Sequence, residues 1–381
     1  MSTTPTIVWL EDEQTRSARW RSSAGNAAPA RVVLADDRMS ADTAFRLASE
    51  GTALLWRGDF QNARQLLQAM ARRIDQAPRR ARRKSTTDGT MPDAFNAHRM
   101  AQAQRARTLG RLLLPVDADG SIPLRRAPDV RDALQNAYGI EQEPVASVVS
   151  LRELQGLIGA HEWRKKGVEI GALGDRIHPH YGVFAPIRNE YVSLVAAAPL
   201  PATSLAFDIG TGTGVLAALL VQRGVRRVVA TDLDPRALAC ARDNLDRLGV
   251  GAAVEVVAAD LYPPGRAPLI ICNPPWVPAR PSSPLEHAVY DPDSRMLRGF
   301  LDGLAAHLSP GGEGWLILSD LAEHLQLRSR ETLLAMIAGA GLQVLERTDV
   351  RPQHPKVMDA ADPLHAARAA EVTSLWRLAI H

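Results

Sequence analysis

A glycine-rich turn constrains the fold of this chain more than any other segment. It reads Asp208-Ile-Gly-Thr-Gly-Thr-Gly214 and stands between a short apolar strand and an apolar helix. Because glycines accept φ values that other residues avoid, Gly210, Gly212 and Gly214 let the backbone approach a ligand closely. In open α/β folds such a turn lies at the C-terminal edge of a parallel sheet, where these folds bind ligands. The turn alone is weak evidence, because dinucleotide-binding enzymes place G-x-G-x-x-G at the same point.

Strands and helices alternate from about residue 161 to residue 381, which is typical of a parallel sheet with helices on both faces. Strands are predicted over residues 204–207, 227–231, 254–258, 269–272, 313–318, 342–347 and 371–379. Helices are predicted over residues 214–223, 235–248, 294–307 and 328–338. The last two strands are expected to pair as an antiparallel edge. We therefore expect an α/β, Rossmann-like sheet of seven strands.

Residues 1–160 have a different pattern, which predicts mainly helices. Apolar residues recur at spacings of three and four between Ala63 and Ile74, after a Gly58-Asp59 pair suited to cap a helix. Further helices are predicted over residues 93–113, 129–138 and 148–157. A chain of 381 residues is long enough for two domains, so we expect one over 1–160 and another over 161–381.

The charge is unevenly distributed along the chain. Its net value is only +3, yet all but one of the residues from Arg79 to Lys84 are basic. Such a run is explained equally by a solvated loop or by a phosphate-binding surface, whose binding would depend steeply on salt. No apolar run of about 18 residues occurs, and the first residues lack the pattern of a secretion signal. We therefore expect a cytosolic (cytoplasmic) protein without a membrane partner.

Cysteine and histidine usage gives no sign of a metal site. Cys240 and Cys272 are the only cysteines, and both fall in apolar segments without metal-ligand spacing. We interpret them as small core residues. His178 and His180 could begin a metal site, but no further ligands follow at suitable spacing, which favours a polar interdomain turn.

The second predicted strand ends on an acidic residue. Asp232 follows Asp208 by 24 residues, and a carboxylate there can accept hydrogen bonds from both hydroxyls of a ribose. Leu233, next in the chain, is assigned to the same cofactor site. Asp234 is an alternative ligand, although its place before Pro235 also suits a helix N-cap.

The third predicted strand is followed by Asp260 and Leu261. Asp260 could accept a hydrogen bond from the exocyclic amine of an adenine, or it could simply cap the loop. Leu261, together with Thr211 in the glycine turn, completes the predicted cofactor site.

The fourth predicted strand stops on Asn273-Pro274-Pro275-Trp276. The two prolines lack a backbone N–H and end the strand. The Asn273 side chain and the Pro274 carbonyl would offer two acceptors to the two hydrogens of an –NH2 group, and Trp276 a face for stacking. The structural alternative is a proline-rich turn with Trp276 filling a gap in the core.

These four strand ends, in this order, resemble the class I S-adenosylmethionine-dependent methyltransferases. The Asn-Pro-Pro-aromatic segment is similar to that of the N-methylating branch, and the closest likeness is to the HemK/PrmC release-factor glutamine methyltransferases. It covers about residues 183–318, including Val183-Phe-Ala-Pro-Ile-Arg-Asn-Glu190. The resemblance implies S-adenosyl-L-methionine as cofactor and methyl transfer to a nitrogen held by Asn273. Trp276 departs from the more usual tyrosine of that group.

The resemblance leaves the substrate open. A glutamine amide of a protein and an exocyclic amine of an RNA or DNA base are equally supported, and a small-molecule amine is a third alternative. The basic N-terminal domain is expected to recognise the macromolecular substrate. A non-catalytic binding module of the same fold and an NAD-dependent dehydrogenase are the rival interpretations, and the glycine spacing with Asn-Pro-Pro-Trp disfavours the second.

Overall fold

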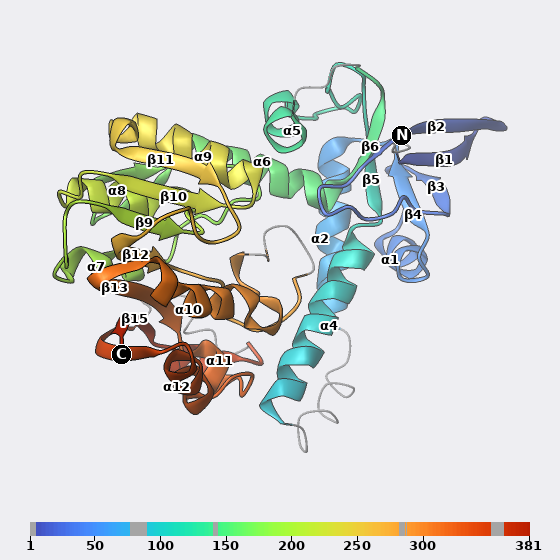
Figure 1. Cartoon of the computed structure of the whole chain (residues 1–381). Helices are drawn as coiled ribbons and strands as arrows, with labels where there is room; N and C mark the ends of the chain where they lie inside the picture. Colours follow the sequence, from blue (N-terminus) through green and yellow to red (C-terminus); the bar gives the residue numbers. More distant parts are fainter. Residues whose placement is uncertain (1–4, 77–89, 140–143, 282–285, 287, 352–361) are drawn as a thin grey trace. The chain divides into compact units, whose positions relative to one another are not determined.

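The computed structural model describes residues 5–76, 90–139, 144–281, 286, 288–351 and 362–381 (Figure 1). The chain divides into two compact units, Met1–Glu162 and Trp163–His381, close to the expected boundary at residue 160. The basic run from Arg79 to Lys84 lies outside the described residues. No helix in the described ranges combines the length and apolarity that a membrane span requires.

The first domain, expected to be mostly helical, also contains a six-stranded mixed sheet in its described residues, which the sequence did not indicate. The strands are β1 (Thr6–Glu11), β2 (Gln14–Arg21), β3 (Val32–Ala35), β4 (Ala53–Trp56), β5 (Leu112–Val116) and β6 (Ser147–Ser150), in the order β1-β2-β6-β5-β4-β3. Strand β4 shows why. All four of its residues are buried, so it shows no alternation, and a short apolar run of this kind cannot be told from a buried helix by periodicity.

The helices of the first unit are α1 (Ala41–Ser49), α2 (Phe60–Gln76), α4 (Met91–Leu109), α5 (Arg131–Tyr138) and α6 (Leu151–Lys166), the last running into the second unit. The predicted apolar stripe lies on α2, and Asp59 caps it by accepting a hydrogen bond from the Gln61 N–H at 2.8 Å. The helix predicted over 148–157 is instead a strand followed by a helix. The β-branched pair Val148-Val149 belongs to β6, and the helix starts at Leu151.

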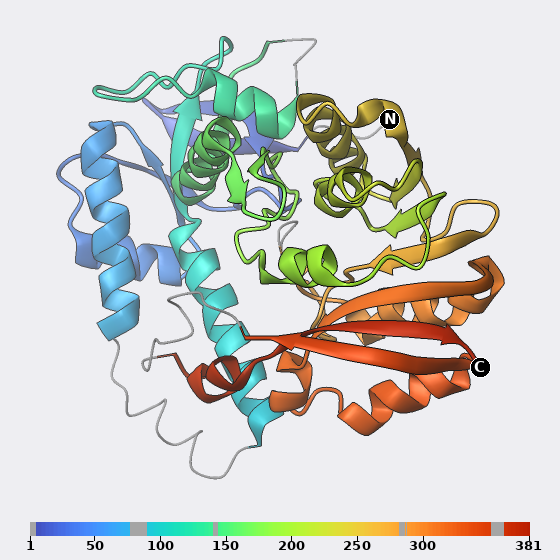
Figure 2. The same ribbon diagram turned by 90° about the vertical axis from the view of Figure 1, so that its left-hand side faces the viewer.

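The second unit contains, in its described residues, a seven-stranded sheet in the order β11-β10-β9-β12-β13-β15-β14. Its strands are β9 (Ala206–Ile209), β10 (Val228–Asp232), β11 (Val254–Ala258), β12 (Ala267–Cys272), β13 (Leu308–Ser319), β14 (Leu342–Val350) and β15 (Thr373–Ile380), and a separate pair is β7 (Val168–Ile170) with β8 (Asp175–Ile177). The expected antiparallel pair is confirmed, because β14 and β15 run antiparallel, as the red strands of Figure 2 show. Strand β15 inserts between β13 and β14, and its pairing with β13 is also antiparallel.

Helices cover both faces of this sheet, with α8 and α9 on one side and α10 and α12 on the other (Figure 1). They are α7 (Glu190–Ala197), α8 (Val215–Gln222), α9 (Pro235–Arg247), α10 (Arg295–His307), α11 (Leu321–His324), α12 (Arg330–Gly339) and α13 (His365–Ala370). Because side chains of a strand alternate between faces, Leu269 and Ile271 of β12 join one core cluster, while Ile270 and Cys272 join the other. Burial on both faces makes β12 a rigid support for the Asn-Pro-Pro-Trp segment that follows it. Cys240 and Cys272 are buried free thiols, as expected.

Candidate active site

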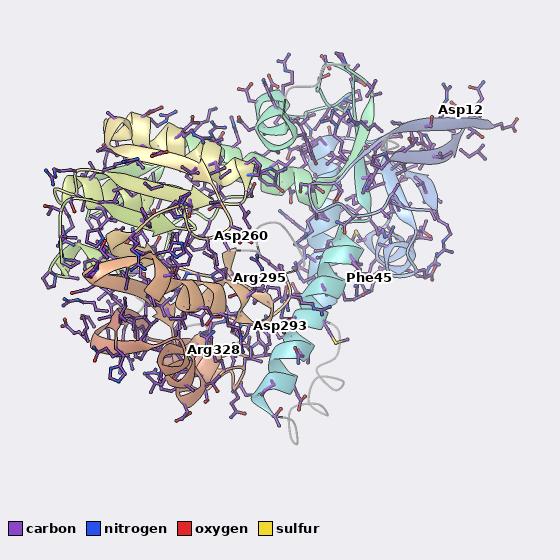
Figure 3. All side chains as sticks on the ribbon, viewed as in Figure 1. Asp12, Phe45, Asp260, Asp293, Arg295 and Arg328 are labelled. Carbon is purple, nitrogen blue, oxygen red and sulfur yellow. The ribbon has the colours of Figure 1, made fainter. Side chains whose placement is uncertain are left out.

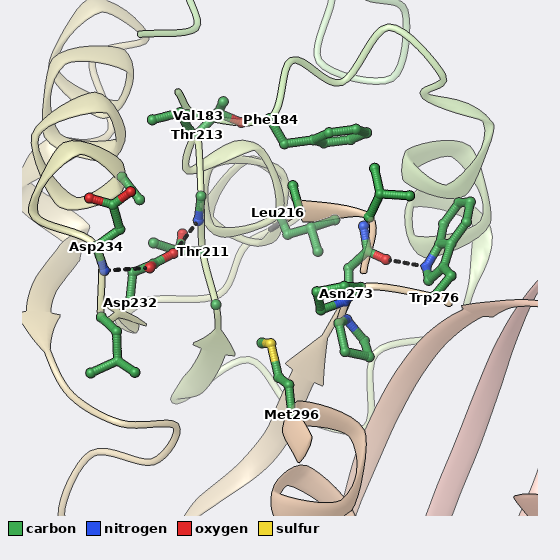
Figure 4. Close-up of a pocket in the computed structure, with 18 of the residues that line it drawn as sticks. Val183, Phe184, Thr211, Thr213, Leu216, Asp232, Asp234, Asn273, Trp276 and Met296 are labelled. Atoms are coloured by element: carbon green, nitrogen blue, oxygen red, sulfur yellow. Dashed lines mark hydrogen bonds between the residues drawn. The ribbon is translucent and has the colours of Figure 1, made fainter. Parts of the chain in front are cut away.

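A cavity of about 680 Å³ opens in the second unit at the C-terminal ends of β10 and β12 and beside the turn after β9. Strand β9 lies between β10 and β12, so the strand order reverses beside it. Ligands of open α/β sheets bind in the crevice at such a point. Figure 4 shows Asp232 on one side of the cavity and Asn273 and Trp276 on the other, with Phe184 above and Met296 below.

The glycine turn supplies part of the cavity wall. Gly210, Thr211 and Gly212 line it, and the two glycines have φ of +72° and +55°. Gly214 does not line the cavity, contrary to its assignment as a cofactor-binding residue. Its φ is +80°, and a Cβ there would lie 3.3 Å from the backbone of Ala241 in α9. Gly214 therefore lets α8 begin directly against α9, and it acts on the cavity only by placing the turn.

Asp208 also differs from expectation, because it is only 1% exposed and does not line the cavity. Its Oδ2 accepts hydrogen bonds from the Thr211 hydroxyl at 2.7 Å and from the Ala217 N–H at 3.1 Å. Its Oδ1 has no hydrogen-bond partner among the described residues. Burial raises the pKa of Asp208 to about 6, and the nearby Asp232 carboxylate adds to the shift. Asp208 is thus a positioning residue that ties the glycine turn to the start of α8.

Replacing Asp208 with asparagine should remove a pH dependence of stability. The folded pKa of about 6 exceeds the ordinary value of 3.8, so between these pH values the folded state binds more protons than the unfolded state. The contribution of Asp208 to the free energy of unfolding of the wild-type protein therefore falls as pH rises from 4 to 7, by about 3 kcal/mol in total. The introduced asparagine cannot ionise, and its Oδ1 can accept both hydrogen bonds. The measurement is urea unfolding of both ligand-free proteins across this pH range, and a constant difference between them would contradict the assignment.

Asp232, at the end of β10, holds the glycine turn in place by a hydrogen bond and also lines the cavity. Asp232 accepts hydrogen bonds from the Gly212 N–H and from the Asp234 N–H, both at 3.0 Å, and burial raises its pKa. Each carboxylate oxygen retains a second lone pair for a ligand. Leu233 lines the cavity and is 59% exposed. Asp234 also lines it, but its side chain caps α9 by accepting a hydrogen bond from the Arg236 N–H at 2.9 Å.

Asp260 and Leu261 line the same region of the cavity. The Oδ2 of Asp260 accepts a hydrogen bond from Arg295 at 2.6 Å, and Figure 3 labels both residues. Leu261 has a φ of +72°, and its carbonyl accepts a hydrogen bond from the Thr231 hydroxyl. This end of the cavity, predicted to hold an adenine, therefore presents an ion pair, where the sequence indicated a lone carboxylate.

The Asn273 side chain is held in place by a hydrogen bond from Trp276. Its Oδ1 accepts a hydrogen bond from the Trp276 indole N–H at 2.9 Å, the dashed line at the right of Figure 4. Because the indole nitrogen only donates, this contact fixes which end of the amide is oxygen. Tyr191, only 3% exposed, also lines the cavity. Pro274 and Pro275 line the cavity beside it. One lone pair of Oδ1 remains for a ligand.

Trp276 does more than provide a stacking face, which is the role that the sequence indicated. Its N–H orients Asn273, and the Arg188 guanidinium lies over its ring, with Cζ 5.6 Å from the centroid. The backbone carbonyl of Trp276 accepts a hydrogen bond from Arg328, which is only 8% exposed and also donates to the Ser294 hydroxyl. Arg328 thereby links the end of Asn-Pro-Pro-Trp to the residue before α10.

Several cavity residues were missed by the sequence reasoning or assigned only loosely. Phe184 lines the cavity, whereas Glu190 does not and instead pairs with Arg188. The residues that were missed include Val183, Arg188, Tyr191, Met296, Leu321 and Glu371. The segment before α7 carried a signal, since Val183 to Glu190 entered the resemblance. Glu371 carried none, because it is 183 residues from the arginine it contacts.

The loop after Asn-Pro-Pro-Trp both caps a helix and lines the cavity. Asp291 caps α10 by accepting hydrogen bonds from the Met296 and Leu297 N–H groups. Ala288, Val289 and Arg295 line the cavity. His287 lies outside the described residues.

The histidine pair packs on α9 within the second unit and does not form an interdomain turn. His180 Nε2 lies 2.8 Å from Asp243 Oδ2, and the His178 N–H donates to the Asn244 side chain. Within the part of the chain that the structure describes, no three His, Cys, Asp or Glu residues are grouped to hold a metal ion.

The cavity fits a nucleoside cofactor with an amino-acid tail. Asp232 offers acceptor lone pairs suited to ribose hydroxyls, and Leu216, Leu261 and Met296 give apolar walls for a base. Gly210 and Gly212 have positive φ values, which favour glycine, so no side chain from these positions projects into the turn where the tail would pass.

Known proteins resemble the second unit. Residues 175–337 match the family described as Methyltransferase small domain. A release factor glutamine methyltransferase of Cereibacter sphaeroides is 32% identical over 195 residues, which are 48% of this chain and 65% of that protein. A tRNA1(Val) (adenine(37)-N6)-methyltransferase of Shewanella loihica is 27% identical over 176 residues, 43% of this chain and 70% of that protein. A solved methyltransferase structure from Pyrococcus furiosus has 18% identity and a TM-score of 0.40, covering 60% of this chain and 98% of that one.

The family match and the named relatives indicate the same class of protein as the residues at the strand ends around the cavity. The chain spans somewhat less than two thirds of the length of the release factor glutamine methyltransferases it matches, 65% and 61% of two of them. Residues 175–337 therefore match a methyltransferase family, and the chain is similar to HemK/PrmC-like class I methyltransferases, with S-adenosyl-L-methionine as the cofactor that this similarity supports.

Proposed function

We propose that this chain is an N-methyltransferase that methylates a planar –NH2 nitrogen of a macromolecule. The observation that supports it most is the immobilised Asn273 amide, which stands in one cavity with Asp232 (Figure 4). Asp232 would hold the ribose of the cofactor at one end, and Asn273 would hold the substrate nitrogen at the other.

The side chains around Asn273 suit alignment of a weak nucleophile. When bound, S-adenosylmethionine supplies a methyl group on a sulfonium, which is already electrophilic. Asn273 Oδ1 and the Pro274 carbonyl would accept the two N–H bonds of the substrate and so direct its lone pair. The same two acceptors would favour the positive charge that develops on the nitrogen. Burial raises the pKa of Tyr191, so its hydroxyl stays neutral beside Asn273.

Two macromolecular substrates fit this chemistry. A protein glutamine amide is supported by relatives named release factor glutamine methyltransferase. An exocyclic base amine is supported by the tRNA-methylating relative and by the basic run from Arg79 to Lys84. The first unit, residues 1–162, would recognise either one.

Calorimetry with S-adenosylmethionine and with NAD tests the activity against its rivals. Binding of the former alone supports a methyltransferase, and binding of NAD alone would favour a dehydrogenase. Binding of neither would favour a non-catalytic module. Transfer of tritiated methyl into cell extract, treated afterwards with nuclease or protease, then separates the substrate classes. Label lost only after nuclease would eliminate the protein substrate.

A further inference from the structure

Asn244 is a buried polar side chain of α9 that the proposed reaction does not use. It is only 1% exposed, and it does not line the cavity. A carboxamide carries two N–H donors and an acceptor oxygen, and burying these groups without partners is unfavourable. The hydrogen-bond partners of Asn244 therefore show which parts of the fold it joins.

The first partner of Asn244 belongs to the segment from His178 to Phe184, which we call the roof segment. Asn244 Oδ1 accepts a hydrogen bond from the His178 backbone N–H at 2.7 Å, and Nδ2 donates to the His178 carbonyl at 3.2 Å. Because a backbone N–H only donates and a carbonyl only accepts, these contacts fix the orientation of the amide. The other end of the roof segment, Gly182 to Phe184, lines the cavity, and Figure 4 shows Val183 and Phe184 above it.

The second partner of Asn244 is the glycine turn. Nδ2 also donates to the Thr213 carbonyl at 3.2 Å and to the Cys240 carbonyl, one turn earlier in α9, at 3.0 Å. Thr213 stands between Gly212 and Gly214 and lines the cavity. One buried amide therefore joins α9, the roof segment and the glycine turn.

The roof segment is attached to α9 at further points beyond Asn244. The His180 N–H donates to Cys240 Sγ at 3.3 Å, and Val183 packs against Ala237 and Cys240 in one buried cluster. Only the Asn244 amide extends these attachments to the glycine turn through the hydrogen bonds described above. Two cavity walls that are already held in place do not have to be ordered when a ligand binds, which favours affinity.

The substrate end of the cavity is built from other elements. Asn273 and Trp276 follow β12 and stand on the other side of the cavity from Asp232 (Figure 4). A change at Asn244 should therefore act on the binding of the cofactor and leave the positioning of the substrate nitrogen intact.

We propose that Asn244 is a positioning residue for the cofactor, because it joins the roof segment to the glycine turn and so sets the separation of two walls of the cavity. Without this amide the two walls separate in the ligand-free protein, and the cofactor has to bring them together when it binds. This inference rests on the proposed function.

Asn244→Asp and Asn244→Ala test this role. The aspartate keeps the shape of the side chain and the acceptor for the His178 N–H, but it places a carboxylate oxygen against the three carbonyls. Both variants should raise the Kd for S-adenosylhomocysteine, measured by calorimetry, at least about tenfold. The rate of tritiated methyl transfer into cell extract, at saturating S-adenosylmethionine, should stay within about threefold of wild type.

His178→Ala is the matched control, because Asn244 bonds to the backbone of His178 and not to its imidazole. Its Kd should stay within about twofold of wild type. A residue that only stabilised the fold would leave the Kd of a folded variant unchanged. A wild-type Kd in folded Asn244 variants, or a saturated rate that falls as strongly as the affinity, would therefore overturn the positioning role.

Hydrogen exchange of the wild-type protein, followed by NMR, tests the same role when the Asn244 variants fail to fold. The His178 amide hydrogen should exchange at least about 100-fold more slowly than in an unfolded chain, without any ligand. An amide that becomes protected only after S-adenosylhomocysteine is added would overturn the inference, because the two walls would then not be joined beforehand. Failure of the wild-type protein to bind S-adenosylhomocysteine would instead overturn the proposed function.

Discussion

Replacing Asn273 with alanine should lower kcat about 10²- to 10³-fold, while the Kd for S-adenosylmethionine stays within about threefold of wild type. The alanine removes the Oδ1 that the Trp276 N–H fixes in place, and with it one of the two acceptors for the substrate –NH2. Asp232, the predicted ribose-binding residue, lies at the other side of the cavity (Figure 4). Single-turnover methyl transfer gives the rate, and calorimetry gives the Kd.

Trp276→Phe is a milder variant that tests the same role of Asn273. It retains an aromatic ring under Arg188 but removes the N–H that orients Asn273. We expect a loss of kcat of about tenfold, consistent with one lost hydrogen bond. Full activity in both variants would show that Asn273 does not position the substrate.

Replacing Asp232 with alanine should raise the Kd for S-adenosylmethionine at least about 100-fold, because two hydrogen bonds from ribose hydroxyls to a carboxylate would be lost. The variant also loses the acceptor for the Gly212 N–H, so the glycine turn is held less firmly. Calorimetry measures the Kd, and thermal unfolding of the ligand-free variant shows whether it is folded.

Asp234→Asn is the matched control at the next acidic position. Asparagine is an equally good N-cap, so α9 keeps its first hydrogen bond and the Kd should change less than about threefold. A larger increase of the Kd for the Asp234 variant than for the Asp232 variant would show that Asp234, and not Asp232, binds the ribose. Equal losses of binding in Asp232→Ala and Asn273→Ala would contradict the division between a cofactor end and a substrate end.

The second unit was largely predictable because its signals are local. Each parallel strand is followed within a few residues by its polar group, and the C-terminal ends of parallel strands meet at one sheet edge. Asp232, Asp260 and Asn273 therefore gather around one cavity although they come from three different strand ends. Asp208 and Gly214 were assigned to the cavity but do not line it, for a shared reason. The sequence does not show whether an acidic residue at a strand end, or a glycine in a turn, faces the cavity or the neighbouring helix.

The sheet of the first unit was not predicted, because its strands pair with partners far away in the sequence. Strand β2 pairs with β6 from the far end of the unit, as Arg19 opposite Ser147 illustrates. Its strands β3, β4 and β6 have only four residues each, too few for a periodic pattern. Only assembly of the sheet reveals them.

The sequence by itself determined the order of strands, the glycine turn and the residue types at each strand end, because these are set within a few residues of one another. The tertiary structure decided which of these residues face the cavity and which support it. It also brought Glu371 to Arg188 and Arg188 to Trp276, contacts between segments up to 183 residues apart. Such contacts depend on how β15 enters the sheet, and no local pattern encodes that placement.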